Sequence, residues 1–234
     1  MSQHYLSSLA RIASRKIQQT FYHLKQNSRI KKMERTGQFL GAENKIICFA
    51  HPRSATRSIG NILELISGHL NLNCFWGYEP LSQKVLQHLI SRYHIIFLHR
   101  TQPGDFPGQF RSLDFKGFHI IRDPRNTLVS LYFSHRYSHE LDQYTPDIKQ
   151  DRLFLENHSE EEGILHLLQR SKQFTEATAS LSEWNNRDPR LLEIRFENYA
   201  VNPEQAWRQI LHFSGISISD QLLKEIATDY SFEI

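Results

Sequence analysis

The chain has 234 residues, of which 39% are hydrophobic and 23% charged, and its net charge at pH 7 is +3. These values are ordinary for one globular domain, and no apolar run approaches the roughly 18 residues that a membrane span needs. Two cysteines, Cys48 and Cys74, are too few for a disulfide framework or a metal site. We therefore expect a cytoplasmic protein in which Cys48, inside an apolar run, is buried.

The first 40 residues differ in charge from the rest of the chain. They contain eight Lys and Arg residues against one acid, so this stretch carries +7 and the remainder −4. Apolar residues recur there at helical steps: Leu6, Leu9, Ala13, Ile17, Phe21 and Leu24. A basic amphipathic helix of this kind either lies on an anionic membrane or a partner, or packs on its own domain with a solvated face. We therefore divide the chain into an arm, 1–40, and a domain, 41–234.

From residue 45 onward, short β-like runs alternate with longer helical stretches. Strands are expected at Lys45–Ala50, His94–Leu98, Gly117–Ile121 and Leu191–Arg195. Helices are expected near 57–68, 80–92, 124–137, 160–186 and 203–213, and loops at 102–113 and 140–158. The alternation and the apolar strands predict a three-layer α/β/α domain whose central parallel sheet is covered on both faces by helices.

Capping residues mark several helix ends. Asp123 and Asn202 each precede a proline, which places an N-cap candidate before a first-turn proline. Ser159 precedes three glutamates, and acids are favourable in the first turn of a helix. Gly215 is expected to end the helix that begins near residue 203.

A short polar loop, His51–Ile59 (HPRSATRSI), follows the first predicted strand. It lacks the G-x-x-x-x-G-K-[ST] spacing of nucleotide triphosphatases. A helix is expected to start near Thr56, where free amides and the helix dipole attract an anion. Arg53 can add a permanent charge, and Ser54 and Thr56 can donate hydroxyls. On spacing alone, the same pattern also fits a simple helix cap.

A second stretch, Gly117–His135 (GFHIIRDPRNTLVSLYFSH), again joins a strand to a helix. Arg122 ends the strand, and Ser130 follows eight residues later, about two turns into the helix. Because the carboxyl ends of parallel strands share one edge of a sheet, Arg122 is expected to reach the same edge as Arg53. Alternatively, Arg122 pairs with a nearby acid and Ser130 is an ordinary helix residue.

Together these stretches resemble the sulfotransferases that use 3′-phosphoadenylyl sulfate (PAPS). The loop at 51–59 is similar to their 5′-phosphosulfate loop, and 122–133 (RDPRNTLVSLYF) to their 3′-phosphate segment. A third segment, 195–216 (RFENYAVNPEQAWRQILHFSGI), is similar as well, so the resemblance spans about 45–234. It implies a P-loop-like nucleotide-binding fold and sulfuryl transfer from PAPS to a hydroxyl or amine, without a metal.

The resemblance also implies roles for individual residues. Arg53 takes the place of a Lys or Arg that stabilises charge on the leaving 5′-phosphate. Residues 54–57 cradle that phosphate, Arg122 and Ser130 hold the 3′-phosphate, and Phe196 contacts the adenine. The implied nucleotide site is therefore Arg53, Ser54, Ala55, Thr56, Arg57, Arg122, Ser130 and Phe196. Ala55 stands where the family usually has glycine.

The acceptor hydroxyl needs a base. His99 ends the second predicted strand, where small-molecule sulfotransferases carry a catalytic histidine, although their Lys-Thr-His is here Phe97-Leu98-His99. Its ordinary pKa suits proton abstraction near neutral pH. Carbohydrate-modifying members use a glutamate after the first loop; Asn61 occupies that place here, and Glu64 is a weaker candidate one turn later.

The sequence leaves the acceptor open among sugars, lipids and small phenols, and gives no sign of nucleic acid. His135 and His139 could line an acceptor site, but we interpret them as solvated helix-end residues. Relatives continue past a similar Ser-Phe-Glu into a basic segment, which the printed sequence lacks; a weakly catalytic nucleotide-binding or scaffold protein is therefore the alternative. A P-loop kinase is disfavoured because no Lys follows a Gly at the required spacing.

Overall fold

The computed structural model describes residues 45–77, 83–99, 115–139, 141, 146–182 and 188–229. Within them, one sheet holds five strands in the order β2-β3-β1-β4-β5, and all neighbours are parallel. The strands are β1 (Ile46–Ala50), β2 (Cys74–Gly77), β3 (Ile95–His99), β4 (Lys116–Ile121) and β5 (Leu191–Arg195). The predicted N-terminal arm lies outside the described residues.

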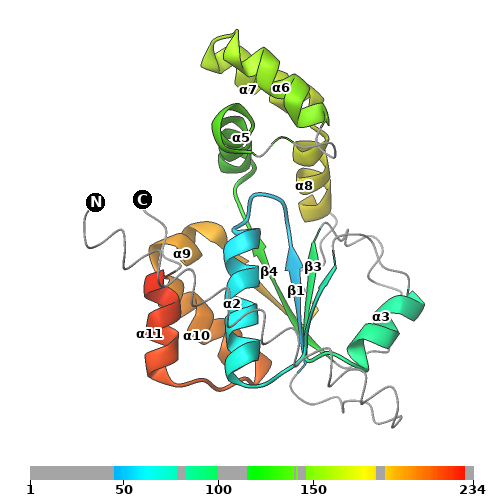
Figure 1. Cartoon of the computed structure of the whole chain (residues 1–234), viewed down its shortest axis with the longest axis vertical. Helices are drawn as coiled ribbons and strands as arrows, with labels where there is room; N and C mark the ends of the chain where they lie inside the picture. The colour runs from blue at the N-terminus through cyan, green and yellow to red at the C-terminus, as the bar shows by residue number, and fades with distance from the viewer. Residues whose placement is uncertain are drawn as a thin grey trace.

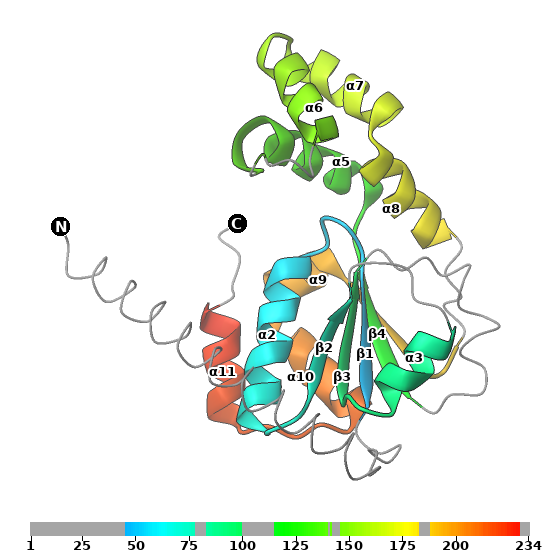
Figure 2. The same cartoon turned by 45° about the vertical axis from the view of Figure 1, so that its right-hand side comes forward.

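Helices cover both faces of this sheet, which confirms the predicted α/β architecture (Figures 1 and 2). One face carries α2 (Thr56–His69), α10 (Pro203–Ser214) and α11 (Asp220–Asp229), with the short α9 (Phe196–Val201) after β5. The other face carries α3 (Gln83–Ile90). The remaining described helices are α5 (Pro124–Phe133), the π-helix η2 (Ser134–Ser138), α6 (Pro146–Glu156), α7 (Glu160–Arg170) and α8 (Lys172–Ser182).

The central strand shows why the sheet is buried on both sides. All five residues of β1 are buried, and successive side chains point to opposite faces. Ile46 and Cys48 join the core formed with α2, α10 and α11, whereas Ile47 and Phe49 pack with Leu89 of α3. An apolar run without polar alternation is therefore what this position in the sheet requires.

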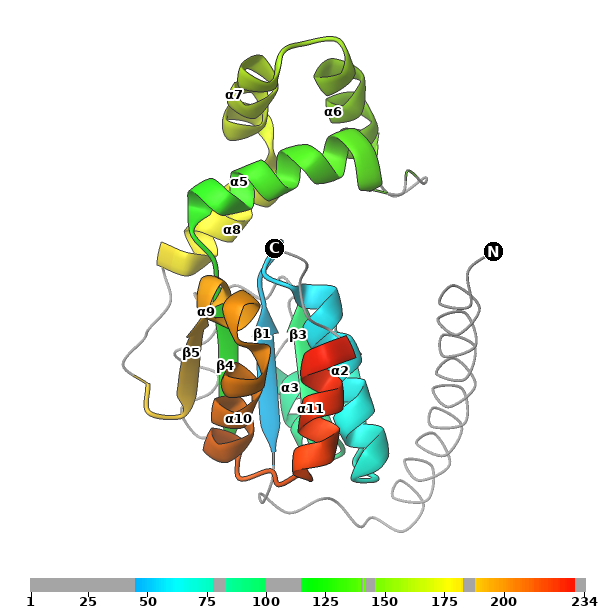
Figure 3. The same ribbon diagram turned by 90° about the vertical axis from the view of Figure 1, so that its left-hand side faces the viewer.

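Helices α5 to α8 form a separate layer beyond the carboxyl ends of the strands (Figure 3). Leu128 and Tyr132 of α5 pack there against Leu155 of α6 and Leu167 of α7, in a small core of their own. Helix α5 leaves β4 and runs across the top of β1 and α2. This layer therefore stands over the edge of the sheet at which ligands of parallel α/β folds bind.

The capping predictions are confirmed. Asp123 accepts a hydrogen bond from the amide of Arg125 at 2.8 Å, and Asn202 accepts one from the amide of Gln205 at 3.0 Å. Ser159 and Glu162 form a full capping box, and Gly215 ends α10 with φ 69°.

Several element predictions were wrong or incomplete, and α9 and α11 were not predicted. Strand β2 was missed because it has only four residues, and the predicted loop at 140–158 contains α6. The helix expected over 160–186 divides into α7 and α8 at Ser171, which leaves the helical region with ψ 112°. The hydroxyl of Ser171 then accepts a hydrogen bond from the Phe174 amide at 3.3 Å. A serine that can cap a new helix start thus favoured a break that helical periodicity alone does not reveal.

Gly60 permits the close approach of α2 to β2. A methyl group at this position would lie 2.0 Å from Cη2 of Trp76, whose indole packs 4.7 Å from the ring of Phe97. Because overpacking of this kind costs about 1–3 kcal/mol, Gly60→Ala should lower the Tm measured by calorimetry by several degrees. Gly68→Ala, at an exposed site in the same helix, is the matched control and should keep or raise the Tm. An unchanged Tm for Gly60→Ala would contradict the tight contact.

Candidate active site

The loop between β1 and α2 contains two non-glycine residues with left-handed backbone. The φ angle is 65° at Arg53 and 58° at Ala55. This conformation costs a residue with a Cβ atom about 1–2 kcal/mol, so the surrounding contacts must hold it. The carbonyl of His51 accepts hydrogen bonds from the Thr56 hydroxyl at 2.8 Å and from the Ser54 amide at 3.3 Å. The loop is therefore closed on itself, and the Thr56 hydroxyl is used in closing it.

Helix α2 begins directly after this loop without a side-chain cap. Its N-cap residue is Ala55, whose methyl group cannot accept a hydrogen bond. The amides of the first turn, together with the positive end of the helix dipole, are thus available to an anion. Most helices carry Ser, Thr, Asp or Asn at the N-cap position. Because α2 has alanine there, its first amides are left for an anion.

The side chain of Arg53 ties the loop to helix α5. Its Nε lies 3.3 Å from Oγ of Ser130, and its Nη2 donates to the same hydroxyl at 3.1 Å and to the Ser130 carbonyl at 3.0 Å. The sequence predicts separate roles for these residues at the two phosphates of a nucleotide. The structure brings them into direct contact, so the residues predicted for the two phosphates lie side by side.

Arg122, at the end of β4, completes the connection. Its Nη1 donates to the Arg53 carbonyl at 2.8 Å, and its guanidinium lies 4.2 Å from the ring centroid of Phe196. Its Nε is buried and has no hydrogen-bond partner among the described residues. A buried N–H without an acceptor is costly, and an anionic oxygen would satisfy it.

Positive charge dominates this edge of the sheet. Burial lowers the pKa of Arg53, and the neighbouring charges of Arg122 and Arg57 lower it further. Burial likewise lowers the pKa of Arg122, and the carboxylate of Glu197 partly offsets that effect. Glu197 itself accepts hydrogen bonds from the Asp123 amide at 3.2 Å and the Asn126 amide group at 3.3 Å. Three guanidinium groups therefore converge where one carboxylate compensates them, which is the electrostatic pattern of an anion site.

Two buried histidines meet where the loop begins. Nε2 of His51 is 3.3 Å from Nδ1 of His119 in β4, and Nε2 of His119 is 3.4 Å from the Glu193 carboxylate of β5. Burial, followed by the proximity of His51, lowers the pKa of His119 to about 2, so its ring is neutral at every ordinary pH. The sequence did not predict these contacts of His119, because a single histidine in an apolar strand gives no sign of its partner.

The candidate bases differ in how the structure places them. His99 ends β3 in register with Ala50, the last residue before the loop, so its backbone stands at the expected edge. Its side chain lies outside the described part of the chain. Burial raises the pKa of the Cys74 thiol, and the charge of Glu64 raises it further. Glu64 therefore lies close to Cys74. Because Cys74 begins β2 at the opposite edge of the sheet, Glu64 is too far from the loop to act as the base.

The prediction of a solvated His135 was wrong. The side chain is 2% exposed, and its Nδ1 lies 2.9 Å from Oδ2 of Asp151 in α6. His166 of α7 lies 2.9 Å from the other oxygen of the same carboxylate. The burial follows from α6, which occupies part of a segment expected to be a loop. His139 is half-buried beside this cluster.

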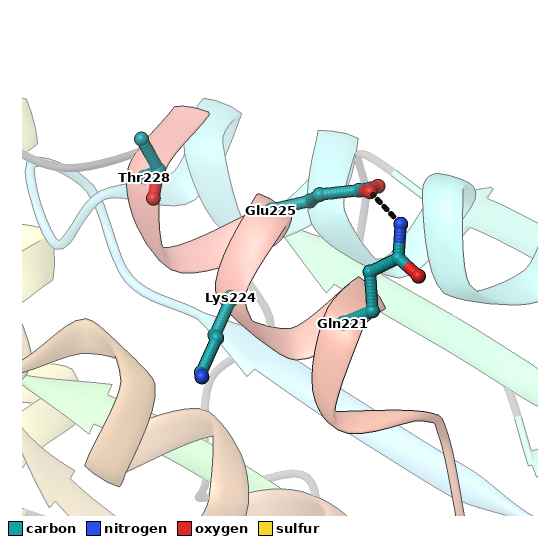
Figure 4. Close-up of a pocket in the computed structure, with 4 residues that line it drawn as sticks. All are labelled: Gln221, Lys224, Glu225 and Thr228. Carbon is teal, nitrogen blue, oxygen red and sulfur yellow. Dashed lines mark hydrogen bonds between the residues drawn. The ribbon is translucent and has the colours of Figure 1, made fainter.

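Other features lie apart from the carboxyl edge. A surface pocket on α11 is lined by Gln221, Lys224, Glu225 and Thr228, and Figure 4 shows them along one face of the helix. None of the predicted site residues lines it, and its Gln221 amide is bonded to Glu225 at 3.1 Å. Within the described ranges, no group of His, Cys, Asp or Glu could hold a metal, and no helix is long and apolar enough to cross a membrane.

The family of the chain follows from a match to the sulfotransferase domain over residues 23–234. This match covers most of the sequence, including all three motifs and both arginines of the site. The protein therefore belongs to the sulfotransferase family, as the motifs at 51–59 and 122–133 predict.

Solved structures share its fold. Mouse sulfotransferase SULT7A1 complexed with PAP has a TM-score of 0.57 and 17% identity, over 82% of this chain and 65% of that chain. Retinol dehydratase in complex with androsterone and the inactive cofactor PAP has a TM-score of 0.49 and 14% identity, over 83% and 66%. The chain thus spans just under two thirds of the length of these two proteins. No curated protein matches it. The likeness to SULT7A1 confirms the predicted fold.

The left-handed backbone at Ala55 yields a test of the loop. Glycine adopts φ 58° without the penalty that Ala55 carries, so Ala55→Gly should raise the Tm by roughly 2–4 °C, which corresponds to about 1 kcal/mol. Ala227→Gly in α11 is the matched control and should lower the Tm, because glycine weakens a helix interior. If thermal unfolding shows both variants destabilised alike, position 55 does not have the left-handed backbone described here.

Proposed function

We propose that this protein is a PAPS-dependent sulfotransferase, which moves a sulfuryl group from PAPS to a hydroxyl or amine of a small-molecule, carbohydrate or lipid acceptor. The observation that carries the proposal is the convergence of Arg53, Arg122 and the uncapped start of α2 on one edge of the sheet. Membership of the sulfotransferase family supports it, and so does the PAP complex of a protein with the same fold.

The residues at this edge fit a nucleotide that carries two separate anionic groups. The amides at the start of α2 and the guanidinium of Arg53 suit one phosphate, and the residues 54–57 would surround it. The unpartnered Nε of Arg122 suits a second phosphate. Arg53 contacts both Arg122 and Ser130, so we expect Ser130 to lie near that phosphate as well. We propose Phe196 as the contact of the adenine; one face of its ring is covered by Arg122, so the base would use the other face or the edge.

The bound donor supplies an activated sulfuryl group on its 5′-phosphate. Arg53 and the α2 amides are placed to stabilise the negative charge that grows on that phosphate as it leaves. The fixed loop orients the reacting groups, which is the main task in a reaction of this kind. The acceptor's proton needs a base, and the resemblance implies His99, whose backbone stands at the end of β3 beside Ala50.

The alternative is a nucleotide-binding or scaffold protein on the same fold with weak activity. Both functions predict that the donor site binds adenosine 3′,5′-bisphosphate (PAP), so binding alone does not separate them. Transfer of labelled sulfate from PAPS to a panel of phenols, alkyl glycosides and sterols does. Transfer to any member supports the enzyme, whereas binding without transfer to any of them favours the scaffold.

Binding of PAP tests the site itself. A concentration of PAP about 100 times its Kd stabilises the folded state by about 2.7 kcal/mol, or roughly 5–10 °C in Tm for a chain of this size. Arg122→Gln should remove most of this increase, because it deletes the buried N–H that lacks a partner. Arg125→Gln is the matched control, since Arg125 is 89% exposed and pairs only with Asp123 among the described residues. A wild-type protein whose Tm does not respond to PAP would rule out the proposed function.

A further inference from the structure

A second imidazole, that of His139, directly follows the π-helix η2 at the end of α5. We propose that His139, in place of the His99 that the resemblance implies, is the catalytic residue that takes the proton of the acceptor during sulfuryl transfer. This inference rests on the proposed function and deepens it. In the step, the bond between acceptor oxygen and sulfur forms and the bond between sulfur and the 5′-phosphate oxygen breaks. The bonding pair stays on the phosphate, and the acceptor's proton goes to Nε2 of His139.

Contacts along one helix connect His139 to the donor loop. Ser130 of α5 receives the hydrogen bonds of Arg53, and Ser134 follows one turn later at the start of η2. The hydroxyl of Ser134 lies 3.5 Å from Nδ1 of His139. Helix α5 and its continuation run above the loop and the start of α2 in Figure 3. The helix that contacts Arg53 through Ser130 therefore also contacts the imidazole of His139 through Ser134.

The backbone before His139 has an unusual and well-fixed conformation. Residues 134–138 form a π-helix, in which the amide of His139 bonds to the Ser134 carbonyl at 2.8 Å. Such turns are rare and are frequently found at functional sites. Arg152 of α6 fixes the turn by donating to the carbonyls of His135 at 2.7 Å and His139 at 2.6 Å.

A buried cluster supports the imidazole from behind. The rings of His135 and His139 meet edge to face, with centroids 5.9 Å apart. His135 is held in turn by Asp151, whose other carboxylate oxygen is engaged by His166. We assign His135 and Asp151 as positioning residues, because they act on the acceptor only through His139. Among the described residues, the hydrogen bonds of His139 use its Nδ1 and its carbonyl, and we propose Nε2 as the atom that meets the acceptor hydroxyl.

The charges near His139 favour its neutral imidazole, which is the form that a base requires. Burial lowers its pKa, and so do His135 on η2, Arg53 in the loop, Arg152 on α6 and Arg57 on α2. The imidazole is therefore neutral near neutral pH, with a lone pair to accept a proton. Bound anionic donor would offset the charges of Arg53 and Arg57, which raises the pKa of His139 at the moment when it must hold a proton.

The deciding experiment follows the histidine ring signals of the full chain by NMR, with and without saturating PAP. In the free protein we expect His139 to titrate below the ordinary pKa of histidine. His69, exposed at the far end of α2 about 20 Å along the helix, serves as the control residue. PAP should shift the titration of His139 upward and leave the ring signals of His69 in place. His139 signals that PAP binding does not move would overturn the proposal. A wild-type protein that does not bind PAP would instead refute the proposed function.

Turnover provides the second arm, with the acceptor identified by the labelled-PAPS panel. His139→Gln should lower turnover by about 100-fold or more while preserving the rise in Tm with PAP. It should also remove the acidic limb of the pH–rate profile, whereas His69→Ala should change neither. Asp151→Asn should lower turnover less and shift that limb. If His139→Gln keeps normal turnover and His99→Asn loses it, the proton goes to His99 and the proposal fails.

Discussion

The hydrogen bonds of two arginines hold the site together. Arg53 reaches from the loop after β1 to Ser130 on α5, and Arg122 reaches from the end of β4 to the carbonyl of Arg53. The sheet, the loop and the helical layer are therefore joined at one point. This arrangement places like charges close together in partly buried surroundings, a cost that a bound anion relieves. The left-handed backbone at Arg53 and Ala55 and the uncapped start of α2 add further costs to folding at the same edge of the sheet, as a proposed anion site would be expected to do.

Sequence reasoning predicted the framework of the fold because the strands and caps depend on local chemistry. The apolar runs of β1, β3 and β4 and the capping signals at Asp123 and Asn202 each specify their element without reference to the rest of the chain. The positions of Arg53 and Arg122 follow as well, because parallel strands present their carboxyl ends at one edge. Local pattern and sheet geometry were sufficient for this part of the site.

What the sequence could not reveal depends on contacts between distant residues. The hydrogen bonds between Arg53 and Ser130 join residues 77 positions apart, and no spacing rule predicts that the two meet. The burial of His135 likewise depends on Asp151, in a helix whose weak periodicity resembles a loop. The chain of His51, His119 and Glu193 crosses three segments through side chains that are each unremarkable alone. These features arise from packing, which a single sequence does not encode at any one position.

The π-helical turn also bears on how this segment is compared between relatives. A π-turn accommodates one more residue than an α-helical turn, and each residue rotates the following side chains by about 100°. Loss of one residue between Ser134 and Ser138 would restore regular helix and turn position 139 away from the loop. Relatives of different length here would then present different chemical groups above the loop that follows β1. Alignments that treat 124–139 as one continuous α-helix would pair residues that do not occupy equivalent places.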